Sequence, residues 1–103
     1  MKENNIQALC RMEASRLGAL IWRNNVGKLQ DKTGRWVTYG LCVGSADLIG
    51  IYRGKFLAIE IKMPGKKTTK EQEIFLQAIR NNGGIAGVVH SPEDVESLLT
   101  SSI

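Results

Sequence analysis

The chain has 103 residues, enough for one modest hydrophobic core and too few for two folded units of ordinary size. Apolar residues make up 43% and charged residues 23% of it, which excludes a disordered, fibrous or coiled-coil protein. No apolar run approaches the roughly 18 to 20 residues that cross a bilayer, and the first residues lack the apolar segment of a signal peptide. We therefore expect a single cytoplasmic domain over residues 1–103 with no membrane partner.

The net charge of +4 is unevenly distributed along the chain. Residues 1–70 carry a net charge of +8, whereas residues 71–103 carry −4. A basic surface attracts polyanions, of which nucleic acid is the commonest in the cytosol, although an ordinary solvated surface is the alternative. The charge pattern therefore makes nucleic acid a candidate partner without proving it.

Side chains that often bind transition metals are scarce. Cys10 and Cys42 have no CxxC spacing, so both are expected to be buried as small apolar residues in a reducing cytosol. His90 is the only histidine, which excludes a metal site built from several histidines.

The first predicted element is an amphipathic helix over residues 6–20. Its apolar residues recur at helical spacing, and Gly18 is expected to end it. Glu13 lies on the apolar stripe of this helix. It therefore either enters a functional site or pairs with a basic neighbour such as Arg16.

Two strands with a basic loop between them follow this helix. The strands are predicted over residues 20–26 and 36–43, and the loop over residues 27–35. Aromatic side chains flank the loop, and we expect them in the core rather than as stacking platforms for bases. These aromatic residues are Trp22, Trp36 and Tyr39.

The next segment predicts a β-hairpin whose register brings two acids together. Runs 47–52 and 56–62 flank a turn that contains Gly54. With a turn of two or four residues, Asp47 lies opposite Glu60, and opposed side chains on antiparallel strands have Cβ atoms roughly 4.5 to 5.5 Å apart. A three-residue turn or a bulge would shift this register.

Downstream, the pattern is typical of helix, strand and helix. Thr69 with Gln72 fits a capping box at the start of the first helix, which ends near residues 81–84. Residues 85–90 form a short apolar run suited to an interior strand. Ser91, followed by a proline, is the expected N-cap of a closing helix.

Two carboxylates facing each other repel unless a cation or a raised pKa compensates. A divalent metal is the simplest solution: the Asp47 and Glu60 carboxylates and the Ile61 backbone carbonyl would offer hard oxygen ligands suited to Mg²⁺ or Mn²⁺. Lys62 lies on the same strand face as Glu60, where it would orient water or stabilise charge on a phosphate. Without the opposed Asp47, the Glu60-Lys62 spacing is also typical of an ordinary surface pair.

These residues resemble the PD-(D/E)xK nuclease superfamily and, more narrowly, the VRR-NUC group of virus-type replication and repair nucleases, in the stand-alone form seen in phages. The resemblance runs from about residue 13 to residue 99, and Ala46 stands where family members often have proline. It rests on Gly44-Ser45-Ala46-Asp47-Leu48, then Glu60-Ile61-Lys62, with Glu13 in the preceding helix and Gln72 in the following one.

The resemblance implies an α/β fold with an αβββαβ core, a mixed central sheet flanked by helices and a C-terminal helix. It implies a Mg²⁺- or Mn²⁺-dependent DNA endonuclease with Asp47 and Glu60 as metal ligands and Lys62 as the catalytic lysine. Glu13 would bind the metal directly or through water, and Gln72 would match the family's catalytic glutamine, although its capping role needs no chemistry.

The resemblance also implies a homodimer acting on Holliday junctions or other branched DNA, in the host cytoplasm if the gene is a phage's. Basic side chains near the site strand and in the loop are expected to contact DNA phosphates. They are Lys66, Lys67 and Lys70, and Lys28, Lys32 and Arg35.

Three alternatives remain open from the sequence. The first is a general nicking or flap nuclease, because family likeness does not fix the substrate. The second is a non-catalytic nucleic-acid-binding module whose acids are structural. The third is an interaction protein that docks a partner through its acidic last third.

Overall fold

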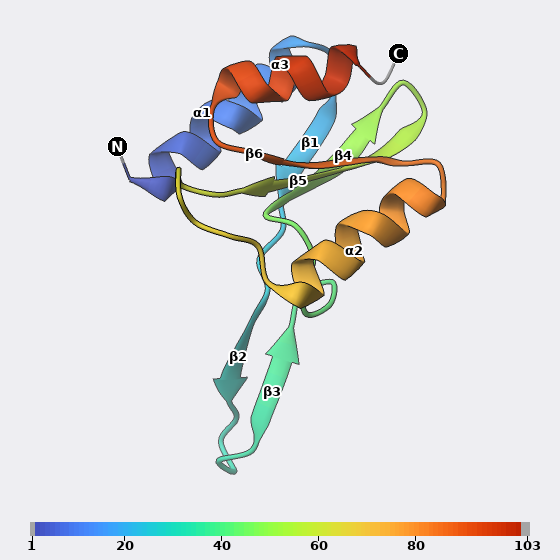
Figure 1. The fold of residues 1–103 in the computed structure, drawn as a ribbon. Coiled ribbons are helices and arrows are strands. Elements are labelled where there is room, and N and C mark those ends of the chain that lie inside the picture. Colours follow the sequence, from blue (N-terminus) through green and yellow to red (C-terminus); the bar gives the residue numbers. More distant parts are fainter. Residues whose placement is uncertain (1, 102–103) are drawn as a thin grey trace.

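The computed structural model describes residues 2–101, which form a four-stranded sheet with helices on both faces and a separate two-stranded arm (Figure 1). The sheet order is β1-β4-β5-β6; β1-β4 and β4-β5 are antiparallel and β5-β6 is parallel, so the predicted mixed sheet is confirmed. Its strands are β1 (Leu20–Arg23), β4 (Leu48–Tyr52), β5 (Lys55–Ile61) and β6 (Ile85–Val89).

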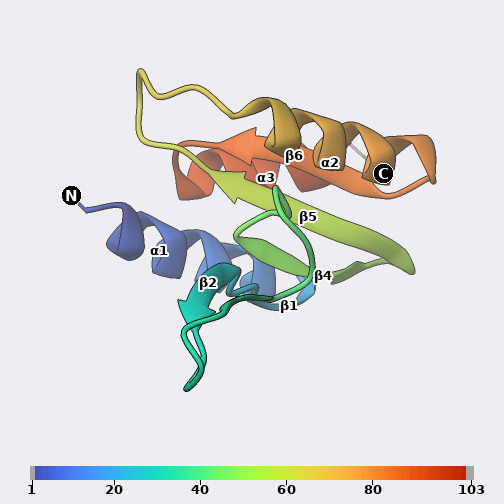
Figure 2. The same cartoon turned by 90° about the horizontal axis from the view of Figure 1, so that it is seen from below.

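Helices α1 (Glu3–Arg16) and α3 (Pro92–Thr100) cover one face of the sheet, and α2 (Lys70–Asn81) covers the other (Figures 1 and 2). The alternation of β5 side chains decides which residue faces which layer. Leu57 and Ile59 are buried in the α1 and α3 layer, whereas Ala58 packs with Leu76 of α2. Glu60, two residues after Ala58, therefore points to the α2 side.

The helix ends follow from local sequence. Thr69 and Gln72 form the predicted capping box at α2, and the Ser91 side chain caps α3 as predicted. Helix α1 spans Glu3–Arg16 rather than residues 6–20, because Gly18, with φ of +101°, turns the chain out of the helix. Within residues 2–101, none of these helices has the length and apolar character needed to span a membrane.

The segment predicted as a basic loop is partly a strand. Strands β2 (Gly27–Gln30) and β3 (Trp36–Tyr39) pair in an antiparallel arm that projects from the body of the protein (Figure 1). The Asp31 carboxylate accepts hydrogen bonds from the backbone N–H groups of Thr33 and Arg35 and so forms the tip. Strand β2 was not predicted because residues 27–30 do not alternate between apolar and polar side chains.

Side chains on and around the arm are exposed, so the prediction that its aromatic residues lie in the core is wrong. Trp36 is 66% and Tyr39 46% exposed on the projecting arm, and Trp22, on the edge strand β1 of the main sheet, is 41% exposed. Cys10 is buried as predicted, but Cys42, in the segment that returns from the arm, is exposed.

Gly50 offers a test of the β1-β4 pairing. A Cβ at this position would overlap the backbone carbonyl oxygen of Leu20 on the neighbouring strand. We expect Gly50→Ala to lower the free energy of unfolding by about 1–3 kcal/mol, as overpacking does elsewhere. Chemical denaturation measures this loss. The adjacent Ile51→Thr, at a half-exposed site, should change stability by less than about 1 kcal/mol, and equal losses in both variants would contradict this account.

Candidate active site

The β4-β5 hairpin brings Asp47 and Glu60 face to face. Tyr52 pairs with Lys55 across a two-residue turn, and the register continues to the pair of Leu48 and Ile59. One step further places Asp47 opposite Glu60, as the sequence predicts. Asp47 raises the pKa of Glu60, as expected for a second carboxyl group on the same face of the hairpin.

Asp47 is fixed at the end of β4 by contacts on both sides. Its Oδ2 accepts a hydrogen bond from the Ile61 backbone N–H at 2.9 Å, and its backbone carbonyl accepts one from Asn24 N–H at 2.8 Å. In an extended strand, one residue's N–H and C=O point to the same side. The Ile61 carbonyl therefore points toward the Asp47 side of β5.

Glu60 is the buried ionisable residue of this site. The residue is only 2% exposed, and its Oε2 is buried with no hydrogen-bond partner among the described residues. Burial raises the pKa of Glu60, and the contact with Asp47 raises it further, whereas the charge of Lys62 lowers it. An unpartnered buried carboxylate oxygen is costly, so the arrangement favours a proton or a cation at this position.

The loop before Asp47 is tied to its surroundings on two sides. The side-chain amide of Asn24 donates to Ser45 Oγ at 2.8 Å and to the Ala46 carbonyl at 2.9 Å. Gly44, with φ of +83°, lies against α2, where a Cβ would be 2.6 Å from the Glu71 carbonyl oxygen. No larger residue fits at Gly44 without moving the loop, so this glycine helps to place Asp47.

Asp47 and Glu60 open into a polar pocket of about 280 Å³ that α1, β1 and α2 help to line. Gln72 belongs to the capping box of α2 and also lines this pocket. Its Oε1 accepts a hydrogen bond from Thr69 N–H at 2.8 Å within the capping box, and its side chain also lines the pocket. With Oε1 occupied, the Gln72 amide NH₂ is the group left to donate into the pocket.

Lys62 follows directly after β5 and continues its alternation, so it lies on the same side as Glu60. Its backbone N–H donates to the Val89 carbonyl at 3.0 Å, and its carbonyl lies 2.7 Å from His90 Nδ1. A carbonyl oxygen only accepts, so His90 Nδ1 carries the proton. The single histidine thus anchors the backbone that carries the lysine.

Glu13 is not brought to this pocket. It forms an ion pair with Arg16, with 2.6 Å between Oε2 and Nη2, and Arg16 also contacts Glu96 of α3 at 3.5 Å. Gln7 is the α1 residue that lines the pocket, and Glu13, six residues later, lies about 240° further around the helix. The predicted place of Glu13 beside Asp47 and Glu60 is therefore wrong, and pairing with Arg16, the alternative considered, is observed.

Helix α1 contributes Gln7 to the pocket, and the charge of its Glu3 raises the pKa of Glu60 by less than burial and Asp47 do. Glu3 and Gln7 are four residues apart and share a helix face. Sequence reasoning missed both because it followed the apolar stripe and began the helix at residue 6. The signal available in the sequence was that these two polar residues are four positions apart at the start of a helix, which places them on one face.

The donor set fits a hard divalent cation held by few protein ligands. Within residues 2–101, no cluster of three or more Asp, Glu, His or Cys side chains is placed to bind a metal. Two carboxylates, one with an orphaned buried oxygen, together with the Ile61 carbonyl would suit Mg²⁺ or Mn²⁺, which keep several waters in such sites.

The predicted phosphate-binding side chains fall into two exposed groups, neither of which lines the carboxylate pocket. One group lies between β5 and the start of α2, and the other lies on the arm. The first group is Lys66, Lys67 and Lys70, and the second is Lys28, Lys32 and Arg35.

This chain resembles known proteins in both sequence and fold. The sequence model of the VRR-NUC domain family matches residues 1–93. A solved structure described as a VRR_NUC domain is 25% identical to this chain, with a TM-score of 0.64 over 95% of this chain and 94% of that one. No curated protein matches the sequence.

The raised pKa of Glu60 predicts a stability that depends on pH. Above its usual pKa of 4.5 the unfolded chain loses this proton while the folded chain keeps it, so the free energy of unfolding falls as pH rises. Without divalent metal, Glu60→Gln should be more stable than the parent at pH 8 by roughly 1–3 kcal/mol. The gain should shrink toward pH 4.5. Denaturation in EDTA across this range measures it, and a constant or negative difference would contradict the burial argument.

Proposed function

Because the chain belongs to the VRR-NUC family, it is a nuclease, and we propose that it is a Mg²⁺- or Mn²⁺-dependent endonuclease that hydrolyses phosphodiester bonds in DNA. The observation that supports this most directly is the buried Glu60 oxygen without a partner, set beside Asp47 at the mouth of a polar pocket. A carboxylate pair of this kind costs stability, and such a cost is typical of a functional site.

Asp47, Glu60 and the Ile61 carbonyl would hold the metal. When bound, such an ion polarises a phosphate oxygen and lowers the pKa of a bound water. The protein's part is to fix the donors. The Ile61 N–H holds the Asp47 carboxylate, and the packing of β5 between two helical layers holds Glu60.

Lys62 and Gln72 are the other side chains proposed to act in the reaction. Lys62 supplies a positive charge on the Glu60 side of β5, where it would stabilise charge growing on the phosphate or orient the attacking water. Gln72 presents its amide NH₂ from the first turn of α2, where its own capping bond fixes the side chain. The Gln72 side chain and the Lys62 backbone are therefore held in place before substrate arrives.

DNA is the proposed substrate, with branched forms such as Holliday junctions favoured by the family resemblance. The exposed lysines between β5 and α2 and the basic side chains of the arm would contact phosphates on either side of the pocket. A nicking or flap nuclease is the nearer alternative. A purely structural role for the acids would make the chain a binding module, but surface binding needs no buried carboxylate.

We further infer a homodimer, whose two-fold symmetry would supply paired sites for a branched substrate. The arm supports it. Leu29 and Val37 face each other across β2 and β3 and share a face with Tyr39, and all three are substantially exposed in the single chain. Apolar side chains on a projecting arm would be covered by the arm of a second copy.

Cleavage tests the reaction. We expect Mg²⁺ or Mn²⁺ to support cutting of four-way junction or flapped DNA and EDTA to abolish it. Asp47→Asn and Lys62→Ala should each lower the rate by about 100-fold or more while DNA binding persists. Gel assays on junction, flap, single-stranded and linear duplex DNA give the rates and the substrate preference.

Two controls accompany this experiment. Glu93→Gln on α3 and Lys55→Gln at the β4-β5 turn remove comparable charges outside the site and should cut like the parent. Mn²⁺ should raise the melting temperature of the parent but not of Asp47→Asn, since a ligand that binds only the folded state stabilises it. Undiminished cutting by Asp47→Asn would show that the site is wrongly assigned.

Sedimentation equilibrium tests the dimer. The parent should sediment at twice the 11.4 kDa chain mass, and Leu29→Lys with Val37→Lys should reduce it to the mass of one chain. Ile74→Lys replaces an apolar residue on α2 that is more exposed than Leu29 or Val37, and it should leave the dimer intact. A monomeric parent at micromolar concentration would rule the dimer out.

A further inference from the structure

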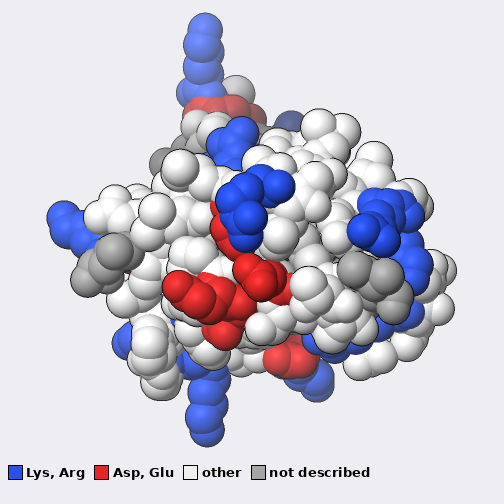
Figure 3. All heavy atoms as spheres, turned by 90° about the horizontal axis from the view of Figure 1, so that it is seen from above, with Lys and Arg blue, Asp and Glu red and all other residues white. Residues whose placement is uncertain are grey.

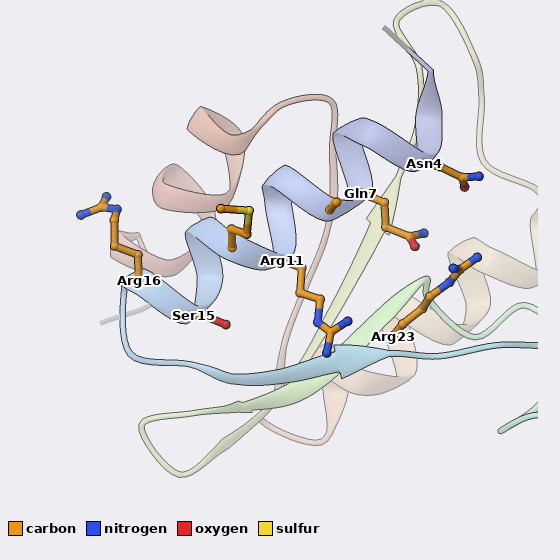
Figure 4. Close-up of a pocket in the computed structure, with 8 residues that line it drawn as sticks. Asn4, Gln7, Arg11, Ser15, Arg16 and Arg23 are labelled. Carbon is orange, nitrogen blue, oxygen red and sulfur yellow. The ribbon is translucent and has the colours of Figure 1, made fainter.

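A second hollow adjoins the carboxylate pocket. It is a groove of about 680 Å³ between α1 and the edge strand β1. Gln7 and Arg23 line both hollows, so the groove leads directly from the site. Figure 4 shows the side chains of Gln7 and Arg11 extending from α1 toward β1, with Arg23 extending from β1 back toward α1.

The three arginines that line this groove differ in their ion pairing. Within residues 2–101, neither Arg11 nor Arg23 forms an ion pair, and both are exposed. Arg16 at the far end of the groove differs, because Glu13 and Glu96 neutralise it. The free guanidinium groups are therefore concentrated on the part of the groove nearest the site.

The groove offers hydrogen-bond donors and no carboxylate side chain. Beside the two guanidinium groups it is lined by the amide side chains of Asn4 and Gln7, and no Asp or Glu lines it. A guanidinium group presents a planar fork of donors that matches the oxygens of a phosphate. The chemistry of this surface is thus that of a phosphodiester backbone.

The opposite side of the α1 and α3 layer has a different charge. Figure 3 shows acidic side chains gathered near the middle of that face, with basic side chains directly beside them. Helix α3 supplies three acids and has no basic residue in its last turn. A polyanion that reaches the site is repelled from α3 and attracted along the α1-β1 groove.

We propose that Arg11 and Arg23 form a phosphate-binding track that holds a DNA strand next to the bond to be cut. The proposal rests on the proposed nuclease activity and adds a binding surface to it. Arg23 would contact the phosphate nearest the pocket, and Arg11 one further along the strand. Neither arginine touches the reacting phosphate, so both act by binding and positioning the strand.

Equilibrium binding in EDTA tests the track without cleavage. The probes are fluorescein-labelled single-stranded DNA, linear duplex and four-way junction, titrated over a range of salt concentrations. Arg11→Gln and Arg23→Gln should each weaken binding several-fold at low salt and reduce the slope of log K against log salt by about 0.7–0.9. With metal present, each should raise KM with little change in kcat, the sign of binding energy shared by substrate and transition state.

The matched control is Lys55→Gln, which removes one exposed charge from the same sheet. Lys55 lies five residues before Glu60, about 16 Å along β5, and should bind DNA like the parent. Arg11 is an exposed residue of α1, and glutamine is a good helix former, so Arg11→Gln preserves the fold even if an edge-strand change at Arg23 does not.

The outcomes separate the track from the nuclease proposal. Binding curves of Arg11→Gln and folded Arg23→Gln that superimpose on the parent's would overturn the track, whether or not the parent cuts DNA. A parent that binds DNA without cutting it, together with weakened binding by both variants, would support the track and reject the nuclease proposal. If Lys55→Gln weakened DNA binding as much as the two arginine variants do, the effect would come from net charge alone, and the track would be rejected.

Discussion

The structure depends on one unfavourable contact, the carboxyl groups of Asp47 and Glu60 facing each other across an antiparallel hairpin. Such a pair persists only where the surrounding fold fixes it. Here the Ile61 N–H holds one member, and burial between helix layers leaves the other no room to turn away. A bound proton or divalent cation would therefore relieve the repulsion between the two carboxylates. Carboxyl groups with perturbed pKa values of this kind are typical of functional sites.

Several other residues position the backbone around this pair of carboxyl groups without touching it. Asn24 and Gly44 fix the loop that delivers Asp47, and His90 anchors the backbone of Lys62. Gln72 serves the helix start and the pocket with different atoms of one side chain. The site is thus built on strand ends and a helix start, whose backbone is more rigid than that of a long loop.

Charge divides the surface into parts with different uses. The α1-β1 groove is basic beside the pocket, the arm is basic near its tip and apolar on one face, and α3 is acidic. A DNA strand placed along the groove would therefore pass the carboxylate pair without crossing α3. In the same arrangement the arm is left free to reach a second copy of the chain or a second segment of DNA.

The sequence by itself determined the hairpin register and both capped helices, because alternation, turn chemistry and capping are local, whereas the mixed sheet was expected only from the family resemblance. The partnership of Asp47 with Glu60 followed from counting residues across Gly54. Tertiary structure alone decided that Glu13 pairs with Arg16, that Gln7 lines the site, and that the arm leaves Trp36 in solvent. These outcomes depend on how α1 is rotated against the sheet and on whether anything packs over the arm, and no local pattern encodes either.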